Sequence, residues 1–283
     1  GADKMITMKG AAVSAKLKEQ VEKGLETLTW VPKLTIIRVG ENPDDISYEK
    51  GATKKLTSFG LEVESKVFPG DISDEAFKKE FAAINADASV DGILMLRPLP
   101  KQINEQDIEK MIDPAKDLDG ISPVNIAKVF SGDTSGFAPC TAEAVVCMLK
   151  MNDIVLSGKR VAVVGRSMVV GRPLSMLLLH ENATVTICHS RTASLPEVCR
   201  EADILTACVG KAAMINHTYV KKDAVVIDVG INVDENGKLC GDVDFAGVEP
   251  IASYITPVPG GVGPMTRAML MSNIVTAARL HTK

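Results

Sequence analysis

A glycine turn between two apolar stretches is the part of this sequence whose residue types and spacing best suit ligand binding. The run Val161–Val164 ends at Gly165, and Gly171 precedes the stretch Leu174–Leu179, which is predicted to be helical. In such a strand–turn–helix unit, N–H groups at the helix N-terminus can bind the pyrophosphate of a dinucleotide. The spacing is Gly-x5-Gly rather than Gly-x-Gly-x-x-Gly, so a tight turn without a ligand is the alternative. The predicted cofactor-binding residues of this turn are Gly165, Arg166, Ser167 and Gly171.

The next apolar run, Ala183–Cys188, ends in a way that distinguishes NADP from NAD. It lacks a terminal Asp or Glu, which would bind a ribose 2′-hydroxyl, and Ser190, Arg191 and Thr192 follow instead. A cation and two hydroxyls suit a 2′-phosphate, so the predicted cofactor is NADP. The alternative places Arg191 on a solvated edge without a ligand.

Composition excludes several classes of function. The chain has 283 residues, 46% hydrophobic and 24% charged, which is typical of a globular protein with room for two domains. A net charge of −4 and an aromatic content of 4% give no reason to expect nucleic acid or an anionic membrane as a partner. No apolar run approaches the roughly 20 residues that cross a bilayer, and the first residues lack the apolar segment of a signal peptide. We therefore expect a cytoplasmic protein.

Cysteine and histidine usage gives no sign of a metal site. The six cysteines show no Cys-x-x-Cys spacing and mostly lie in apolar runs, so we expect buried, reduced thiols. The four histidines are scattered and form no His-Glu-x-x-His motif, so no bound metal is predicted.

Short β-rich runs alternate with helical patterns along the chain, which is typical of parallel βαβ units. The predicted strands are Leu34–Val39, Leu61–Phe68, Gly92–Leu96, Arg160–Val164, Thr184–Cys188, Ile204–Cys208 and Val225–Asp228. The predicted helices are Ala11–Thr27, Ile46–Phe59, Asp74–Asp87, Asn104–Met111, a helix capped by Thr141 that ends near Met151, and Met265–Leu280. Loops are expected around Pro98, Pro100 and Pro114 and over Asp117–Val124.

These elements predict two α/β domains with a cleft between them, the second Rossmann-like with a parallel sheet. The expected boundaries are residues 1–138 and 139–264, with a final helix, 265–283, that returns to the first domain. The segment Pro257–Pro264 combines three prolines with three glycines and is expected to be neither helix nor central strand. It could contact a ligand through its backbone, or it could serve as a rigid hinge.

Several blocks, taken together in this order, resemble the methylenetetrahydrofolate dehydrogenase/cyclohydrolase family of bifunctional folate enzymes. They are Val39–Pro43 with Ser47 and Tyr48, Arg97–Pro100, Lys116–Gly120, Pro139–Thr141, Gly165–Ser167 with Val170–Pro173, His189–Thr192, Asp228–Asn232, Gly241–Val243 and Tyr254–Thr266. The resemblance implies NADP-dependent oxidation of 5,10-methylenetetrahydrofolate to the methenyl form, followed by hydrolysis to 10-formyltetrahydrofolate. It also implies tetrahydrofolate derivatives as substrates, mainly on the first domain, NADP on the second, and a homodimer. The site residues it implies are Tyr48 and Asp119 for catalysis and substrate binding, Pro259, Gly260 and Gly261 for substrate binding, and Ile231 for cofactor binding.

Two positions depart from the family pattern. The family has Tyr-x-x-x-Lys, but Ala52 stands four residues after Tyr48, and the family's glutamine partner of that lysine is Leu96 here. Lys50 or Lys54 could replace the lysine only from a shifted helix. Tyr48 could stack on the pterin or simply pack against a domain face. Lys116 and Asp117, which lie near Asp119 in the sequence, could be a solvated charge pair.

The two family reactions differ in what they require. Hydride leaves a carbon flanked by two nitrogens, whose lone pairs stabilise the cation, so the protein need only align substrate and nicotinamide. Hydrolysis of the methenyl cation moves protons, and a positioned acid/base typically contributes about 10²–10⁴-fold to such a step. We therefore expect dehydrogenase activity with weak or absent cyclohydrolase activity. The alternatives are a fully bifunctional enzyme and a folate- and NADP-binding protein with little turnover; a dehydrogenase for another small substrate fits the Asp119 and Pro257–Pro264 blocks less well.

Overall fold

The computed structural model describes residues 6–281, and the chain divides by its internal contacts into two compact units. Unit 1 contains Pro139–Met269 together with the N-terminal residues up to Lys16. Unit 2 contains Leu17–Ala138 and the C-terminal residues from Leu270. Two helices, α1 (Gly10–Glu26) and α10 (Val262–Leu280), contribute residues to both units.

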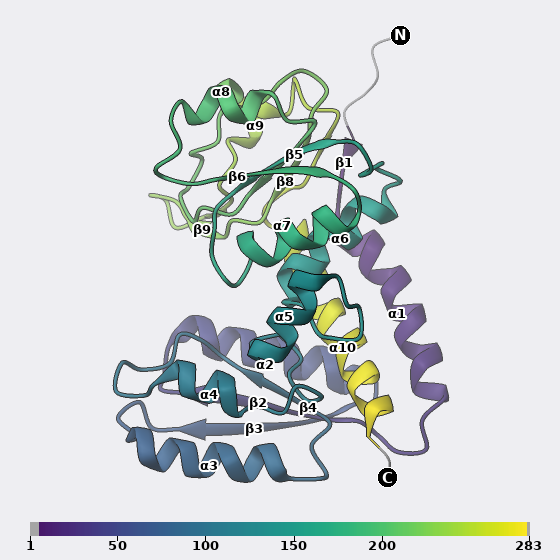
Figure 1. Ribbon diagram of the computed structural model, residues 1–283, viewed down its shortest axis with the longest axis vertical. Helices are drawn as coiled ribbons and strands as arrows, with labels where there is room; N and C mark the ends of the chain where they lie inside the picture. The colour runs from purple at the N-terminus through teal and green to yellow at the C-terminus, as the bar shows by residue number, and fades with distance from the viewer. Residues whose placement is uncertain (1–5, 282–283) are drawn as a thin grey trace. The chain divides into compact units, whose positions relative to one another are not determined.

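Unit 2 is built on a three-stranded parallel sheet of order β3-β2-β4, which can be followed in Figure 1. Its elements are β2 (Lys33–Val39), α2 (Pro43–Ser58), β3 (Glu62–Phe68), α3 (Asp74–Ala86), β4 (Gly92–Met95), α4 (Glu105–Met111) and α5 (Pro123–Ser131). Polar side chains fix the starts of four of its helices, because Asn42, Ser73, Asn104 and Ser122 each accept a hydrogen bond from a backbone N–H of the first turn.

The sheet of unit 2 is buried on both faces by different helices. On one face Ile37 and Met95 pack with the α3 side chains Phe77 and Phe81 in one apolar cluster. Successive strand residues point to opposite faces, so the neighbours of these residues on β2 and β4 point the other way. Gly92 of β4 faces that second side, where a side-chain carbon added to it would collide with Leu118 and with Ile274, a residue of α10.

Unit 1 contains a six-stranded parallel sheet of order β1-β11-β8-β7-β5-β6. Its strands are β1 (Ile6–Thr7), β5 (Arg160–Val164), β6 (Thr184–Cys188), β7 (Ile204–Ala207), β8 (Val225–Asp228) and β11 (Tyr254–Ile255). Its helices include α6 (Cys140–Met151), α7 (Gly171–His180), α8 (Leu195–Arg200) and α9 (Phe245–Val248), with a short 3-10 turn, η1 (His217–Tyr219). A two-stranded antiparallel ribbon, β9 (Asn232–Val233) and β10 (Leu239–Cys240), lies apart from the main sheet.

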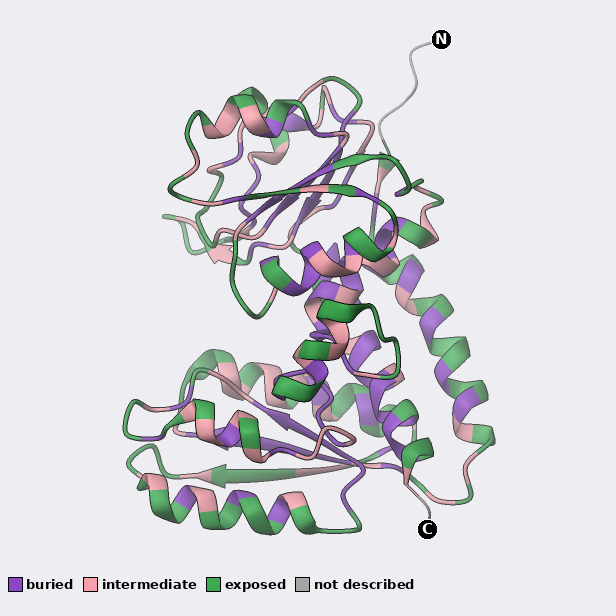
Figure 2. Cartoon of the chain, in the orientation of Figure 1, coloured by how far each residue is buried: buried purple, intermediate pink, exposed green. Residues whose placement is uncertain are grey.

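The central strands of unit 1 are mostly apolar because they are covered on both faces. All residues of β7 and β8 are buried, and Figure 2 shows these strands in the buried colour. The edge strand β6 is more exposed, with only Cys188 fully buried. All six cysteines are free.

Most predicted elements are confirmed, with shifts of one to three residues at their ends. Thr141 is not a helix cap: α6 begins at Cys140 with Pro139 in the cap position, and no side chain caps it. The segment Pro257–Pro264 was expected to exclude helix, but α10 begins at Val262, because a proline fits the first helical turn, where its missing N–H has no helical partner. The loop predicted over Asp117–Val124 ends earlier, since α5 begins at Pro123.

The last helix ends at Leu280, and residues 282–283 of the predicted 265–283 helix lie outside the described part. No helix among the described residues is long and apolar enough to cross a membrane.

Candidate functional site

The glycine turn of unit 1 joins β5 to α7 through tightly packed backbone. Gly165 has a φ of +129°, a conformation open to glycine, and a side-chain carbon there would collide with the carbonyl of Cys208. A side-chain carbon at Gly171 would collide with the carbonyl oxygen of Gly165. The Ser167 hydroxyl accepts from the N–H of Val170 at 3.1 Å, which holds the turn against the start of α7. The side chains of Arg166 and Ser167 are exposed at this turn.

The segment after β6 has an ordered backbone and an open arginine. The hydroxyl of Thr192 accepts from the N–H of His189 at 2.9 Å, and the ring Nδ1 of His189 accepts from the N–H of Arg191 at 3.1 Å. Ser190 and Arg191 are exposed, and among the described residues the Arg191 guanidinium makes no ion pair. Arg191 therefore has a fixed backbone and an exposed guanidinium, which suits binding of a ribose 2′-phosphate.

Strand register brings these two segments to the same edge of the sheet. Val164 of β5 lies opposite Cys188 of β6, so the residues that follow both strands meet at the carboxyl ends of neighbouring parallel strands. The strand order reverses here, because β6 lies on one side of β5 and β7 on the other. Open α/β sheets bind ligands at such a switch point. Ile231, which follows β8 at this edge, is 69% exposed.

A buried carboxylate fixes the loop that contains Ile231. Asp228 ends β8, is 4% exposed, and accepts hydrogen bonds of 3.0 Å from the N–H groups of Gly230, Asp242 and Val243. Burial raises the pKa of Asp228 to about 6, although these three bonds oppose the shift. Asp242 in turn accepts from the N–H groups of Val209, Gly210 and Lys211 and from the Asn232 side chain. The two carboxylates therefore hold together the loops after β7 and β8.

The glycine–proline loop before α10 packs against the start of α1. The carbonyl oxygen of Gly260 accepts from the N–H of Gly10 at 2.9 Å, and a side-chain carbon at Gly10 would collide with the carbonyl oxygen of Gly261. The peptide bond between Val258 and Pro259 is cis. Pro259 and Gly260 are exposed, whereas Gly261 is buried. The loop is thus fixed by backbone packing and still presents exposed atoms.

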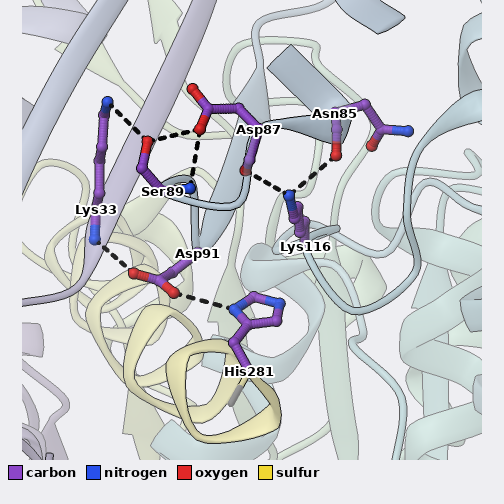
Figure 3. A network of polar contacts seen from close by, with 7 residues as sticks. All are labelled: Lys33, Asn85, Asp87, Ser89, Asp91, Lys116 and His281. Atoms are coloured by element: carbon purple, nitrogen blue, oxygen red, sulfur yellow. Dashed lines mark hydrogen bonds and ion pairs between the residues drawn. The ribbon is translucent and has the colours of Figure 1, made fainter. Parts of the chain in front are cut away.

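In unit 2 the segment that contains Asp119 is anchored by two buried charges. Lys116 is 6% exposed, and its ammonium donates to the carbonyl oxygens of Asn85 and Asp87 (Figure 3). Asp117 is 1% exposed and accepts from the Asn125 side chain at 2.8 Å and from two backbone N–H groups at the start of α5. Burial raises the pKa of Asp117. A solvated charge pair at these two positions is therefore wrong, and both residues are structural.

Asp119 remains partly exposed at the end of this anchored segment. Its carboxylate lies 3.9 Å from the guanidinium of Arg97, whose other nitrogen is 3.9 Å from Glu109. Gly120 follows with a φ of +64°, and a side-chain carbon there would collide with the carbonyl of Phe137. Asp119 is thus presented by a turn whose geometry is fixed on both sides.

Helix α2 places Tyr48 and Ala52 one turn apart, as their spacing predicts. Tyr48 is half-buried, and Ala52 is completely buried, with 0% exposure. Lys50 and Lys54 are exposed, and α2 is continuous over Pro43–Ser58. Each lysine is two residues from Ala52, or about 200° around a helix, so neither shares its face. Within this continuous helix, Tyr48 and Ala52 share a side that Lys50 and Lys54 do not.

Sequence inspection missed a buried cation beside this position. Arg38, near the end of β2, is 9% exposed, and its Nε donates to Glu49 of α2 at 2.5 Å. Its Nη1 donates to the carbonyl oxygen of Gly40. The available signal was an arginine inside the apolar run Leu34–Val39. Among residues 6–281, no group of three His, Cys, Asp or Glu side chains is suited to a metal ion.

A parallel sheet with a glycine turn and an open arginine at its switch point defines a dinucleotide-binding α/β protein. Comparison with known families agrees with that class. Residues 139–282 match the tetrahydrofolate dehydrogenase/cyclohydrolase NAD(P)-binding domain, and residues 8–119 match the catalytic domain of the same family. The chain belongs to the tetrahydrofolate dehydrogenase/cyclohydrolase family, and it is an enzyme with the two-domain α/β fold of that family.

Individual relatives match over nearly the whole chain. Bifunctional protein FolD of Clostridium kluyveri is 48% identical over 98% of this chain and 99% of its own length. The crystal structure of the bifunctional enzyme FolD from Campylobacter jejuni superimposes with a TM-score of 0.95 at 39% identity, covering 98% of this chain and 100% of that one. A Trypanosoma brucei methylenetetrahydrofolate dehydrogenase-cyclohydrolase, solved with NADP and an inhibitor, gives a TM-score of 0.91 at 31% identity, covering 98% of both chains.

Proposed function

We propose that this chain oxidises 5,10-methylenetetrahydrofolate to 5,10-methenyltetrahydrofolate with NADP, and that its cyclohydrolase activity is weak or lost. The observation behind the second half is Ala52, a fully buried methyl group where the family pattern has a lysine. Leu96, at the end of β4, is the apolar counterpart of the family's glutamine. The polar pair associated with the hydrolytic step is absent from both positions.

NADP is the cofactor of the proposed reaction, and it accepts the hydride. The residues of unit 1 fit it: the Gly165–Gly171 turn, which has no space for a side chain at either glycine, leads into the N-terminus of α7, and Arg191 suits the 2′-phosphate. Ser190 and Thr192 flank that arginine, and the exposed Ile231 supplies an apolar contact from the next loop.

We assign the folate to residues of unit 2. Asp119, presented by its fixed turn, suits the amide and amino edge of a pterin, because a carboxylate accepts two parallel N–H bonds. Tyr48 is the proposed contact to the ring, and the family resemblance also favours Pro259, Gly260 and Gly261 as substrate-binding residues. Orientation is all that hydride departure demands of these residues, so the dehydrogenase step does not depend on the lost lysine.

Hydrolysis of the methenyl product is different because water must lose a proton as it attacks. An acid/base that contributes about 10²–10⁴-fold would normally stand beside the reacting carbon. Neither Ala52 nor Leu96 can transfer a proton, and the lysines at 50 and 54 lie on other faces of α2. These facts favour a dehydrogenase with impaired hydrolysis over a fully bifunctional enzyme.

A paired assay tests the proposal. NADPH formation at 340 nm with methylenetetrahydrofolate measures the first step, and loss of methenyltetrahydrofolate above its spontaneous rate measures the second. We expect robust dehydrogenation and hydrolysis close to background. Robust enzymatic hydrolysis would establish a bifunctional enzyme and refute the loss. Folate binding without NADPH formation would select a binding protein and refute the whole assignment.

Cofactor choice is tested separately through Arg191. Arg191→Asp reverses the charge offered to the 2′-phosphate, so we expect NADP affinity to fall by at least about tenfold, as for the loss of a charged hydrogen bond, with little change for NAD. Arg200→Asp, an exposed arginine on α8 bound to the carbonyl of Thr218, is the matched control. An unchanged NADP preference in Arg191→Asp would refute the assignment.

The family resemblance also supports a cytoplasmic homodimer as part of this proposal. Sedimentation equilibrium of the purified chain, and fractionation of cells that express it, test these two points. A monomer, or recovery outside the cytoplasm, would contradict them.

A further inference from the structure

The Arg38–Glu49 ion pair is the buried charge cluster that the proposed reaction has not used. Arg38 is 9% exposed, and the Glu49 side chain is 14% exposed. The arginine spans from β2 to α2: Nε donates to Glu49, and Nη1 donates to the carbonyl of Gly40 and lies 3.5 Å from the exposed carboxylate of Glu41. Shielding charges from water is costly, so the largely shielded Arg38–Glu49 contact calls for a reason.

The pair lies on the face of the sheet that supports Tyr48. Ile37 and Met95 face the α3 side, so Arg38 points to the opposite face, where α2 packs. Ile37 lies opposite Met95, and the N–H of Leu96 donates to the carbonyl of Ile37. Leu96 is therefore the neighbour of Arg38 on the adjacent strand and shares its face.

On the helix side the pair meets the same turn of α2. Glu49 and Ala52 are three residues apart and lie on one side of the helix, and Tyr48 immediately precedes Glu49. The two positions that lost their polar residues, 52 on the helix and 96 on the strand, thus flank the place where Arg38 meets Glu49. The lysine and glutamine of the family pattern are absent from these two positions, and Arg38 and Glu49 form an ion pair near both.

We propose that Arg38, held by Glu49, is the positioning residue of the one-carbon site, supplying from β2 the cation that the family pattern supplies from α2. The inference rests on the proposed dehydrogenase function. The pair fixes the turn of α2 that presents Tyr48 to the folate. A guanidinium stays protonated at any physiological pH, so it can orient groups but cannot serve as the acid/base of hydrolysis. Replacement of a lysine by this arginine would preserve alignment and remove acid/base catalysis.

Substitutions of the pair test its positioning role. In Arg38→Met we expect kcat/KM for methylenetetrahydrofolate to fall by about tenfold or more, since slight misplacement of reacting groups is costly, while the KM for NADP changes less than about twofold. The Kd for tetrahydrofolate, measured by calorimetry without NADP, should rise in parallel. Arg38→Lys keeps the charge but lacks the separate nitrogens through which the guanidinium reaches Glu49 and Gly40, so it should recover part of the loss. Glu49→Gln should fall between Arg38→Lys and Arg38→Met.

Lys33→Met provides the matched control. Lys33 lies at the other end of β2 and forms a comparable ion pair with Glu64, with side-chain exposures of 13% and 33%. We expect it to lower the melting temperature without changing kcat/KM or the tetrahydrofolate Kd. If Arg38→Met lowers only the melting temperature, as the control does, the pair is merely structural and the proposal is wrong.

Introducing the family's lysine and glutamine at positions 52 and 96 tests whether Arg38 occupies the place of the lysine. Ala52→Lys/Leu96→Gln adds a second buried cation beside Arg38, so we expect the melting temperature to fall by about 5 °C or more. Adding Arg38→Met to that variant should recover most of the melting temperature and introduce hydrolysis of methenyltetrahydrofolate. Equal melting temperatures with and without Arg38→Met would show that the two cations do not compete, and would overturn the proposal.

The readouts separate this inference from the proposed function. If the wild-type chain forms no NADPH, the dehydrogenase assignment fails, but the tetrahydrofolate Kd and the melting temperatures still decide the role of Arg38. If the wild-type chain forms NADPH and Arg38→Met retains its kcat/KM and Kd, the dehydrogenase assignment stands and the positioning role fails.

Discussion

The buried carboxylate of Asp228 should give this protein a distinctive dependence of stability on pH. Its pKa is raised from 3.8 to about 6, mainly because burial disfavours the charged form, with a smaller contribution from Asp242. The folded state therefore binds a proton at pH values where the unfolded chain has released it. The contribution of Asp228 to stability is most favourable below pH 4, declines as pH rises through the window from about 4 to 6, and is constant above it.

The size of this effect follows from the two pKa values. One pKa unit corresponds to about 1.36 kcal/mol, so a rise from 3.8 to about 6 costs the folded state about 3 kcal/mol in total, of which about 2.4 kcal/mol is lost between pH 4 and pH 7. Asp228→Asn removes the titrating group and retains its shape. Other carboxylates titrate in both proteins, so the difference in free energy of unfolding between the two isolates Asp228.

Urea unfolding at intervals from pH 4 to pH 7.5 measures that difference. We expect the stability of the wild-type protein relative to Asp228→Asn to fall by about 2.4 kcal/mol over this range. The matched control is Asp203→Asn, because Asp203 bonds Lys221 and the pKa of Asp203 is lowered, so its contribution is lost only as pH falls below its ordinary value. Its stability difference should be constant from pH 5 to pH 7.5. A constant difference for Asp228→Asn as well would refute the reasoning.

Three further predictions concern the anchors of the two units. Asn125→Ala removes one of three hydrogen bonds to the buried Asp117 carboxylate and the acceptor of the Phe137 N–H, and should lower the free energy of unfolding by about 1–3 kcal/mol; a loss below about 0.5 kcal/mol would contradict the network. Gly171→Ala should weaken NADP binding by about tenfold or more in calorimetry, because its side-chain carbon would collide with the turn, whereas Gly263→Ala, with open space around it, should bind normally. His281→Ala removes the 3.0 Å bond to buried Asp91 shown in Figure 3 and should cost about 1–3 kcal/mol by urea unfolding, and an unchanged midpoint would show that this bond contributes nothing.

Local sequence determined the elements and the type of cofactor site. Runs such as Arg160–Val164 and Thr184–Cys188 are β-branched and apolar, so their strand character depends on neighbours only for burial. The tight turn after Val164 follows from Gly165 and Gly171, which lie six residues apart in one segment. Register then follows from the parallel βαβ connection, which is why Gly165 and Arg191 reach the same edge of the sheet.

Some boundaries could not be predicted because competing local signals are nearly equal. Thr141 is a good capping residue, yet Pro139 takes the cap position of α6. Pro264 suggested a loop but lies in the first turn of α10, where proline is tolerated. In both cases tertiary packing selected between starts only a few residues apart.

The roles of buried charges were decided by the tertiary structure alone. By itself the sequence determined two α/β units, a glycine turn suited to NADP, and an alanine at position 52. It did not show that Lys116 binds the carbonyl of Asn85, 31 residues away, or that Arg38 is buried against Glu49. Charged residue types favour water, and a folded chain buries them only where distant segments supply partners of the right geometry. Such partners lie outside any sequence window, so only the folded chain reveals that Arg38 binds Glu49 of α2.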